Sequence, residues 1–211
     1  MKPRVTVVDY GLGNLHSVIK ALAFVGAEVD VAGSGAEIAR AERLVLPGVG
    51  AFADGMAGLR ERGQVAALRE FAAGGRPFIG ICLGAQLLLS ESEEFGQSEG
   101  LGIIPGRVAM IPAGEAKVPH VGWARLQPPE GRTWAGTLLE QTAAGTWGYF
   151  VHSLHCVPTD AADVLATVQP GPHQITAAVR RGRVTGFQFH PEKSGQQGLA
   201  ILQSFVSLAD G

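Results

Sequence analysis

The sequence predicts an α/β fold, a three-layer, doubly wound and mostly parallel sheet to which antiparallel strands are added. Over residues 1–90, short apolar or β-branched runs alternate with segments of helical periodicity, which is typical of a parallel sheet with helices on both faces. After Ser90 the runs are shorter and are separated by glycine and proline, which indicates antiparallel strands. No internal repeat or linker divides the 211 residues, so we expect one domain over residues 1–211.

The composition excludes a disordered chain and argues against a nucleic-acid-binding surface. Hydrophobic residues make up 46% and charged residues 17% of the sequence, and the net charge is −2. The two cysteines, Cys82 and Cys156, do not make a disulfide framework, which indicates a reducing compartment. The segment before Asp9 is too short for a signal peptide, and no apolar run approaches the ~18 residues of a membrane span. We therefore expect a cytoplasmic protein with no nucleic-acid or membrane partner.

The first half of the chain supplies the expected parallel strands and their helices. Residues 5–8 (VTVV) form a continuous β-branched run of the kind that fills a central parallel strand. Further elements follow in alternation: strands at 27–31, 43–46 and 78–81, and helices at 17–25, 36–41 and 56–73, the last with a break near Gly63. Because parallel strands end at one edge of a sheet, the segments that follow these strands are expected to lie together.

The second half supplies mostly antiparallel strands and a final helix. The expected strands lie at residues 108–111, 121–126, 147–151, 164–168 and 175–179. Residues 180–183 (RRGR) are expected at a hairpin tip, and residues 184–190 form the last strand. Residues 196–208 carry apolar side chains at helical spacing, so an amphipathic helix is expected to close the chain.

A candidate nucleophile follows the fourth expected strand. The segment GICLG at residues 80–84 is the cysteine version of the nucleophile elbow, a sharp turn from a strand into a helix. Its glycines allow a tight turn and a close approach of the two backbones. We expect the turn to lift the Cys82 sulfur above the sheet edge, where a helix N-terminus favours the thiolate. The alternative for Cys82 is a small buried thiol at a strand end.

Two loops at the same sheet edge are candidates for binding. Residues 9–14 (DYGLGN) contain two glycines of a dinucleotide-binding fingerprint, but His16 replaces the third. We therefore interpret this segment as a loop that displays Asn14. Residues 47–50 (PGVG) end the third expected strand and leave backbone amides uncovered by side chains. They form either an ordinary turn or a set of N–H donors for an anion.

A candidate base lies at the end of the last expected strand. Pro191 restricts His190 to the extended region. Alternation along an extended backbone then places His190 and Glu192 on the same side. A histidine oriented by a carboxylate is the base-and-orienter pair of a nucleophilic triad. Together with Cys82, these residues predict a cysteine hydrolase whose thiolate attacks a carbonyl carbon.

Such a reaction also needs N–H donors for the developing oxyanion. The amide of Leu83, just after the elbow, is one candidate. The amides of Gly48, Val49 and Gly50 are the others. Gln86 lies one helical turn after the nucleophile, so we expect its side chain to face the same cleft unless it is a plain surface residue.

These motifs together resemble the class I, or triad-type, glutamine amidotransferases. The resemblance rests on GICLGAQ at residues 80–86 and FQFHPE at residues 187–192. Within this family the chain is similar to the glutaminase subunits of imidazole glycerol phosphate synthases. That closer likeness is carried by DYGLGN, PGVGAF, HVGW, YFVHS and the Lys-Ser pair after Glu192. These segments run in order from position 9 to position 194, so the resemblance covers essentially the whole chain and implies the flavodoxin-like amidotransferase fold.

The resemblance implies a reaction and the residues that perform it. Cys82 would form a γ-glutamyl thioester from L-glutamine and release ammonia, with His190 and Glu192 completing the triad. Residues 48–50 match the family's oxyanion strand, in which a peptide reorients on activation. No cofactor is implied, and no His/Cys cluster of the sequence has the spacing of a zinc site.

The resemblance also implies substrate contacts and a partner. Gln86 and Glu94 match positions that bind glutamine, and Glu94, otherwise part of a charged surface loop, would hold the α-amino group. Asn14, Tyr149 and Lys193 match the interface with a cyclase subunit, a (β/α)₈ barrel that forms a heterodimer with the glutaminase and takes up its ammonia. The barrel joins ammonia to phosphoribulosyl-formimino aminoimidazole carboxamide ribotide, giving imidazole glycerol phosphate and an aminoimidazole carboxamide ribotide in histidine biosynthesis. We expect the isolated chain to hydrolyse glutamine poorly.

Departures from the family pattern leave the triad intact. Ala85, Ala124 and Leu154 stand where methionine, asparagine and an aromatic residue are common in the family. The alternatives are the glutaminase of anthranilate or aminodeoxychorismate synthase, a cysteine peptidase of a related fold, and an inactive scaffold subunit. The other amidotransferases typically carry a different motif at residues 9–14, and a peptidase is not expected to end its base motif in His-Pro-Glu.

Overall fold

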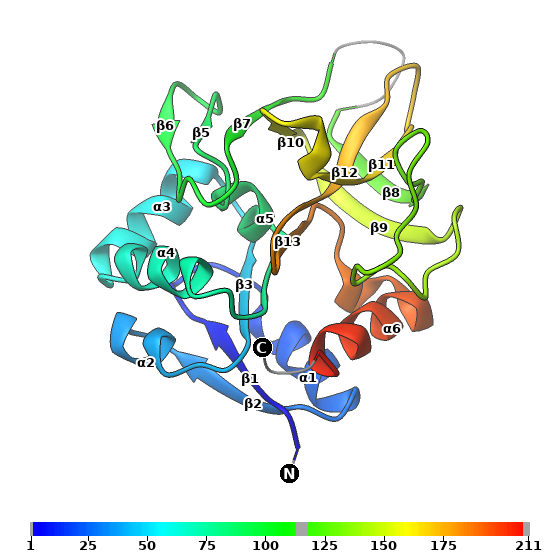
Figure 1. The fold of residues 1–211 in the computed structure, drawn as a ribbon. Coiled ribbons are helices and arrows are strands. Elements are labelled where there is room, and N and C mark those ends of the chain that lie inside the picture. Colours follow the sequence, from blue (N-terminus) through cyan, green and yellow to red (C-terminus); the bar gives the residue numbers. More distant parts are fainter. Residues whose placement is uncertain (1, 113–117, 209–211) are drawn as a thin grey trace.

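The computed structural model describes residues 2–112 and 118–208. Within them, seven strands form a central sheet in the order β11-β12-β13-β4-β3-β1-β2 (Figure 1). These strands are β1 (Arg4–Val8), β2 (Glu28–Ala32), β3 (Leu44–Gly48), β4 (Phe78–Cys82), β11 (Val164–Val168), β12 (Ile175–Arg181) and β13 (Val184–Phe187). Each lies where the sequence predicts a strand, but β13 stops at Phe187 instead of continuing to His190.

The central sheet combines parallel and antiparallel pairs, as predicted. β2, β1, β3, β4 and β13 run parallel, and β12 and β11 extend the sheet in antiparallel fashion. In this register Gly48 lies opposite Cys82, and Phe187 lies opposite Ile81. The segments after β3, β4 and β13 therefore meet at one edge of the sheet. The strand order reverses next to them, between β1 and β3, which is where α/β sheets bind ligands.

Helices cover both faces of the central sheet (Figure 1). One face carries α1 (Leu15–Phe24) and α6 (Gly195–Val206), and the other carries α2 (Gly35–Ala39), α3 (Phe52–Glu61), α4 (Val65–Ala73) and α5 (Leu83–Leu87). Val45 of β3 packs into the layer of α1 and α6, whereas Leu44 and Leu46 pack into the opposite layer. This division follows from the alternation of side chains along a strand. The three-layer architecture is confirmed.

The helices differ from the predicted ones at their ends. The segment expected as a broken helix over 56–73 is two helices, separated at Gly63, which has a φ of 63°. α3 begins earlier than predicted, at Phe52, because the Glu94 carboxylate accepts the Phe52 N–H at 2.6 Å and satisfies a free donor of the first turn. After the elbow, α5 ends at Leu87 and is only five residues long.

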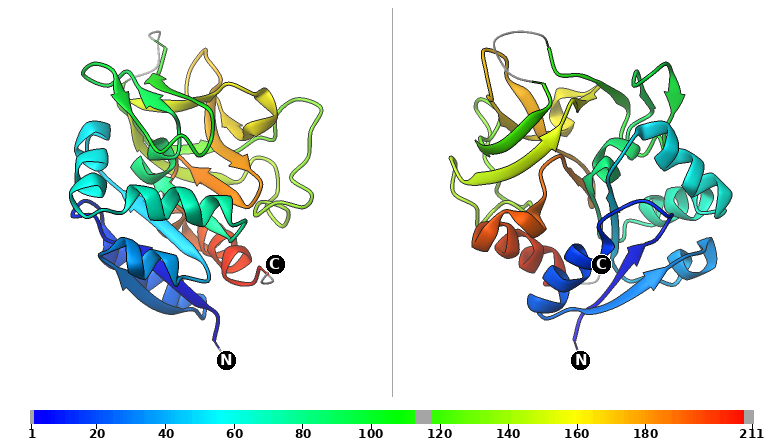
Figure 2. Two further views of the ribbon diagram at one scale, coloured as in Figure 1. Left: turned by 60° about the vertical axis from the view of Figure 1, so that its left-hand side comes forward. Right: turned by 180° about the vertical axis from the view of Figure 1, so that it is seen from behind.

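The remaining strands form a smaller sheet, β10-β7-β5-β6, and a ribbon of β8 and β9. Their bounds are β5 (Glu91–Ser92), β6 (Ser98–Glu99), β7 (Gly106–Met110), β8 (His120–Arg125), β9 (Trp147–His152) and β10 (Leu154–Pro158). Figure 2 places these strands at the end of the molecule opposite the start of β1. The sequence did not predict β10, and it placed β5 in a surface loop. Among the described residues, no helix has the length and apolarity needed to cross a membrane.

Candidate active site

The structure forms the predicted elbow at the end of β4. Cys82 has a φ of 56° and a ψ of −111°, a conformation that residues other than glycine rarely adopt. Strain of this kind is typical of a nucleophile held at a sharp turn. A Cβ at position 84 would collide with the Leu46 carbonyl oxygen, and a Cβ at position 80 would lie 2.6 Å from the Gly84 carbonyl oxygen. Both positions therefore require glycine, as predicted.

His190 lies between Cys82 and Glu192. Its Nδ1 is 2.8 Å from Glu192 Oε1, and its ring also hydrogen-bonds the Cys82 side chain. The side chains of His190 and Glu192 are only 5% and 1% exposed. The His190 backbone is held on both sides, because its N–H donates to Tyr149 O at 2.9 Å and its carbonyl accepts the Ser194 hydroxyl at 2.6 Å. The structure thus brings the three predicted catalytic residues together.

The contact between His190 and Glu192 arises differently from the prediction. His190 is extended, with a φ of −98° and a ψ of 96°, as expected before Pro191. The next residues, Pro191–Lys193, form the 3-10 turn η2 instead of continuing as a strand. Alternation along an extended chain therefore does not align the two side chains. The turn does, because proline is favoured at the first position of a helical segment and the chain folds back there.

The surroundings of His190 favour its protonated form. Burial alone lowers the pKa of His190, but its hydrogen bonds to Cys82 and Glu192, together with their charges, outweigh burial and raise the pKa to about 9. The sequence predicts that the N-terminus of the helix after the elbow favours the thiolate. Because α5 is only five residues long, the protonated imidazole is the stronger positive charge beside the sulfur.

The predicted oxyanion residues flank Cys82. Gly48 is buried at the end of β3, and Val49 and Gly50 line the cleft in front of the elbow. Gly50 has a φ of 102°, which glycine adopts without strain. Leu83 lines the same cleft from the other side of the nucleophile. Two backbone segments therefore lie on either side of the nucleophile.

A cleft of about 340 Å³ opens at Cys82. The edge of the central sheet forms one wall of it, and the loop before β8 together with β9 and β10 forms the other. Glu94 and Lys193 contribute one acidic and one basic side chain to the lining. A cavity of this size and mixed polarity suits a small polar molecule.

Gln86 lines the cleft and anchors a chain of amides that leads to the nucleophile. Its Nε2 donates to Leu154 O at 3.2 Å and to Gln188 Oε1 at 3.0 Å. Gln188 Nε2 in turn donates to Cys82 Sγ at 4.0 Å. Gln188 is not among the site residues predicted from the sequence. Its position two residues before His190 was the available signal, because in an extended run such residues lie on one side.

The residues expected at a partner interface lie around the active site. Lys193 is exposed at the cleft. Asn14 is exposed and caps α1, since its Oδ1 accepts the Ser17 N–H at 3.4 Å. Tyr149 is half-buried, and its ring centroid lies 5.5 Å from that of Trp123.

An apolar surface that the sequence analysis did not predict runs along the β8–β9 ribbon. Val121 pairs with Val151 and Trp123 with Tyr149 in the antiparallel register. Val121, Trp123 and Val151 are 58%, 51% and 40% exposed. We call these four residues the ribbon face. The apolar residues at alternate positions of both strands were the signal, because they share one side of the ribbon, and exposed apolar patches mark interaction sites.

The other histidines near the cleft are poor candidates for a base. Burial lowers the pKa of His152 to about 4, and its Nδ1 lies 2.7 Å from Leu154 O. Burial also lowers the pKa of His120 and of His155. In the part of the chain that the structure describes, no three His, Cys, Asp or Glu side chains are grouped to hold a metal ion.

The sequence matches a known protein family over most of its length. The model of the family "Glutamine amidotransferase class-I" matches residues 6–208. The chain belongs to this family. Two solved structures share the amidotransferase fold. PurLQS from Thermotoga maritima has a TM-score of 0.75 at 23% identity and covers 97% of this chain and 98% of its own. A structure described as a glutamine amidotransferase has a TM-score of 0.74 at 19% identity, with 96% and 99% covered.

Relatives of this amidotransferase in sequence carry a more specific name. The imidazole glycerol phosphate synthase subunit HisH 1 of Legionella pneumophila (strain Lens) is 44% identical over 97% of this chain and 99% of its own length. The corresponding subunit HisH of Moorella thermoacetica is 47% identical, with 99% and 96% covered. That of Synechococcus sp. (strain JA-3-3Ab) is 48% identical, with 96% and 93% covered. The likeness to these subunits therefore extends over nearly the whole chain.

Proposed function

We propose that this chain is the glutaminase subunit of an imidazole glycerol phosphate synthase, in histidine biosynthesis, and that it hydrolyses L-glutamine through Cys82, His190 and Glu192. The observation that carries the proposal is the contact of a strained cysteine with a buried His–Glu pair, in an amidotransferase whose relatives of that name align over nearly its full length. We also propose that residues 1–211 form a single domain and that the protein is located in the cytoplasm.

The reaction proceeds in two halves through a covalent intermediate. The Cys82 thiolate attacks the side-chain carboxamide carbon of glutamine, and the protonated His190 gives its proton to the leaving nitrogen, so that ammonia departs and a γ-glutamyl thioester remains. The neutral His190 then takes a proton from water, which attacks the thioester and releases glutamate and the thiolate. Glu192 holds the imidazole and stabilises its charged form.

Backbone amides stabilise the oxyanion in both halves. The amide of Leu83 is one donor, and the segment of Gly48, Val49 and Gly50 supplies the other after a peptide reorients. Removing one such donor typically costs roughly 10²–10³ in kcat. Dependence on a reoriented peptide explains why the chain would be slow on its own.

The cleft accommodates an amino acid the size of glutamine. Gln86 has both amide hydrogens engaged by protein acceptors, so it offers its carbonyl oxygen to the substrate. Glu94 lines the same cleft and receives the positively charged α-amino group. The capping bond to α3 holds Glu94 in place for this purpose.

The partner of this glutaminase is a cyclase subunit, a (β/α)₈ barrel that forms a heterodimer with it and takes up the ammonia. Asn14, Tyr149 and Lys193 contribute to the interface. The ribbon face supports the proposal, since it offers exposed aromatic and aliphatic side chains next to the active site. The cyclase converts phosphoribulosyl-formimino aminoimidazole carboxamide ribotide and ammonia to imidazole glycerol phosphate and an aminoimidazole carboxamide ribotide.

A glutamate-release assay tests the function. We expect slow hydrolysis by the isolated chain and an acceleration of roughly 5–150-fold when the cyclase subunit and its nucleotide ligand are present. Full turnover without the cyclase would contradict the coupling. Absence of glutamate release from the complete complex would contradict the function itself.

The pH dependence of the reaction reports on His190. Because its pKa is raised to about 9, the imidazole is protonated below this pH and neutral above it. Protonation of the leaving nitrogen needs the charged form, so we expect kcat/KM for glutamine hydrolysis by the complex to fall as the pH rises through about 9. In Glu192→Gln the hydrogen bond and charge that raise this pKa are weakened, and the fall in kcat/KM should move to lower pH. An unchanged midpoint in that variant would contradict the assignment.

The ribbon face is expected to contribute to cyclase binding. Trp123→Ala removes a half-exposed indole and should raise the Kd for the cyclase subunit by at least about tenfold, because tryptophan is a frequent anchor of interfaces. Phe24→Ala is the control: Phe24 is 78% exposed at the far end of α1 and should leave the Kd unchanged. Isothermal titration with the purified cyclase measures both. Equal Kd values for the two variants would exclude the ribbon face from the interface.

A further inference from the structure

We propose that Tyr10 is a positioning residue for the oxyanion segment, residues 48–50. Its hydroxyl binds the Gly48 carbonyl when the Val49 N–H points at the intermediate on Cys82. The inference rests on the proposed function, because it concerns the oxyanion donors of the same reaction. Tyr10 belongs to the DYGLGN motif, and neither substrate binding nor the partner interface explains its presence there. The inference assigns it a role.

Tyr10 lies between the oxyanion segment and the elbow. Its side chain is 2% exposed and packs in the same apolar layer as Phe52 and Leu83. A Cβ on Gly48 would collide with the Tyr10 hydroxyl and would lie 2.9 Å from Leu83 Cβ and 3.1 Å from Gly84 N. The hydroxyl therefore fills the space that a side chain at position 48 would occupy, in contact with Gly48.

The Tyr10 hydroxyl is buried and has no hydrogen-bond partner among the described residues. Buried polar groups are generally paired, because leaving one unpaired forfeits the hydrogen bonds that it made to water. Burial, and next the charge of Cys82, raise the pKa of Tyr10 far above its ordinary value. The phenol therefore stays protonated and can donate a hydrogen bond at any working pH.

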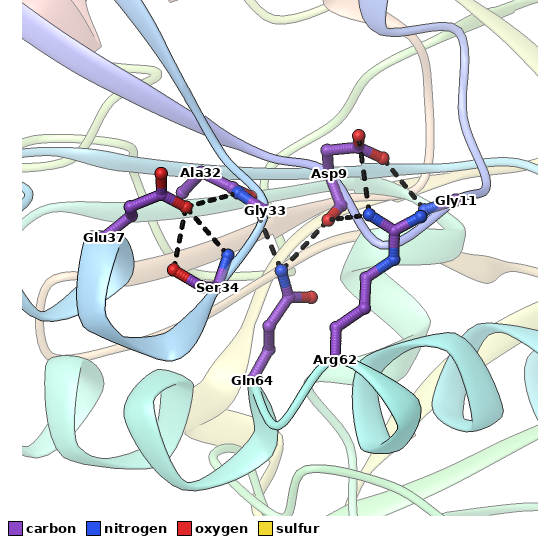
Figure 3. A network of polar contacts seen from close by, with 8 residues as sticks. All are labelled: Asp9, Gly11, Ala32, Gly33, Ser34, Glu37, Arg62 and Gln64. Atoms are coloured by element: carbon purple, nitrogen blue, oxygen red, sulfur yellow. Dashed lines mark hydrogen bonds and ion pairs between the residues drawn. The ribbon is translucent and has the colours of Figure 1, made fainter.

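A polar network holds Asp9 and Gly11, the two neighbours of Tyr10 in the chain (Figure 3). The Asp9 carboxylate accepts the Gly11 N–H at 2.9 Å and lies 3.6 Å from the Arg62 guanidinium. The buried Gln64 donates its amide to the Asp9 carbonyl at 3.0 Å. Arg62 and Gln64 belong to the corner between α3 and α4, so the backbone of the loop is tied to that corner. Tyr10 is thus a fixed point beside a segment that reorients.

The geometry of a peptide bond links the hydroxyl to the reorientation. In a trans peptide the C=O and the next N–H point in opposite directions. When the Val49 N–H turns into the cleft, the Gly48 carbonyl therefore turns away from it, toward the protein interior. A carbonyl that becomes buried needs a donor. The hydroxyl of Tyr10 is an unpaired donor in contact with that residue.

Tyr10→Phe tests the inference, because it removes only the hydroxyl. In the complex with the cyclase and its nucleotide ligand, we expect kcat for glutamine to fall about tenfold, while KM changes by less than about twofold. The temperature of thermal unfolding should not fall, since the hydroxyl is unpaired in the structure. A merely structural role predicts the opposite pattern, namely lower stability with kcat retained.

The controls separate this inference from the proposed function. Thr6→Val removes a largely buried hydroxyl from the middle of β1 and should keep the wild-type kcat. Alkylation of Cys82 by iodoacetamide should proceed in Tyr10→Phe at the wild-type rate, because it needs the nucleophile but no oxyanion donor. An active wild-type complex with an unchanged kcat in Tyr10→Phe would overturn the role of Tyr10 alone. A wild-type complex without glutaminase activity would overturn the proposed function together with it.

Discussion

Cys82→Ala is expected to lower the glutaminase kcat of the complex by roughly 10⁴–10⁶, because removing the nucleophile of a triad eliminates the covalent route. The active site is otherwise expected to stay formed, since alanine occupies the space of the cysteine Cβ. Formation of imidazole glycerol phosphate with added ammonium salts should therefore continue at the wild-type rate. Two assays on one preparation measure this, glutamate release and ammonia-dependent cyclisation.

Cys156→Ala is the matched control. It removes the chain's other thiol, which is buried in β10 and 3.7 Å from Ala85 O. We expect this variant to retain glutaminase activity with a modest loss of stability. Residual glutamate release by Cys82→Ala at more than a hundredth of the wild-type rate would contradict the thioester mechanism.

Gly84→Ala is expected to lower the free energy of unfolding by about 3 kcal/mol or more. Its Cβ would collide with the Leu46 carbonyl oxygen, and neither backbone can retreat easily, because β3 and β4 are paired from Leu44 to Gly48. The elbow should open, so Cys82 should also lose contact with His190. Chemical denaturation measures the stability, and the rate of iodoacetamide alkylation measures the reactivity of the thiol.

Gly33→Ala serves as the control for that variant. A Cβ on Gly33 would meet only Glu37 Oε2 at 3.9 Å, an ordinary contact distance. We expect its free energy of unfolding to change by no more than roughly 0.5 kcal/mol. Similar losses in both glycine variants would show that the close approach at the elbow is not what requires glycine at position 84.

Local sequence signals were sufficient for the parallel core and for the three residues of the proposed triad. Apolar runs of strand length, each followed by a segment of helical periodicity, predicted the positions of the first four strands in the sequence. The glycines around Cys82 revealed the elbow because a close approach of two backbones leaves no other choice of residue. The alignment of His190 with Glu192 was predicted with the wrong geometry. Pro191 restricts His190 to an extended conformation and also starts a helical turn. The predicted geometry included only the first of these two effects.

Features that depend on distant contacts were not predictable from local patterns. The length of α5 is set by the return of the chain into the smaller sheet, where Leu101 N donates to Leu87 O at 2.9 Å. The residues next to Glu94 in the sequence did not indicate that its carboxylate would cap α3. The contact of Tyr10 with Gly48 joins the loop after β1 to the last residue of β3, and these come together only when β1 and β3 pair. Such partners are identified by the fold and not by a residue's neighbours in the sequence.

Because Cys156 is deeply buried, thiol labelling can measure how many molecules have a reactive Cys82. Burial raises the pKa of this thiol to about 12, so in the native protein it remains a poorly reactive thiol while the elbow cysteine is labelled. The chain has only two cysteines, and unfolding exposes both. Twice the ratio of label taken up by the native protein to the total taken up after denaturation thus gives the fraction of molecules whose Cys82 is reactive. Each preparation carries its own internal standard for comparing specific activities.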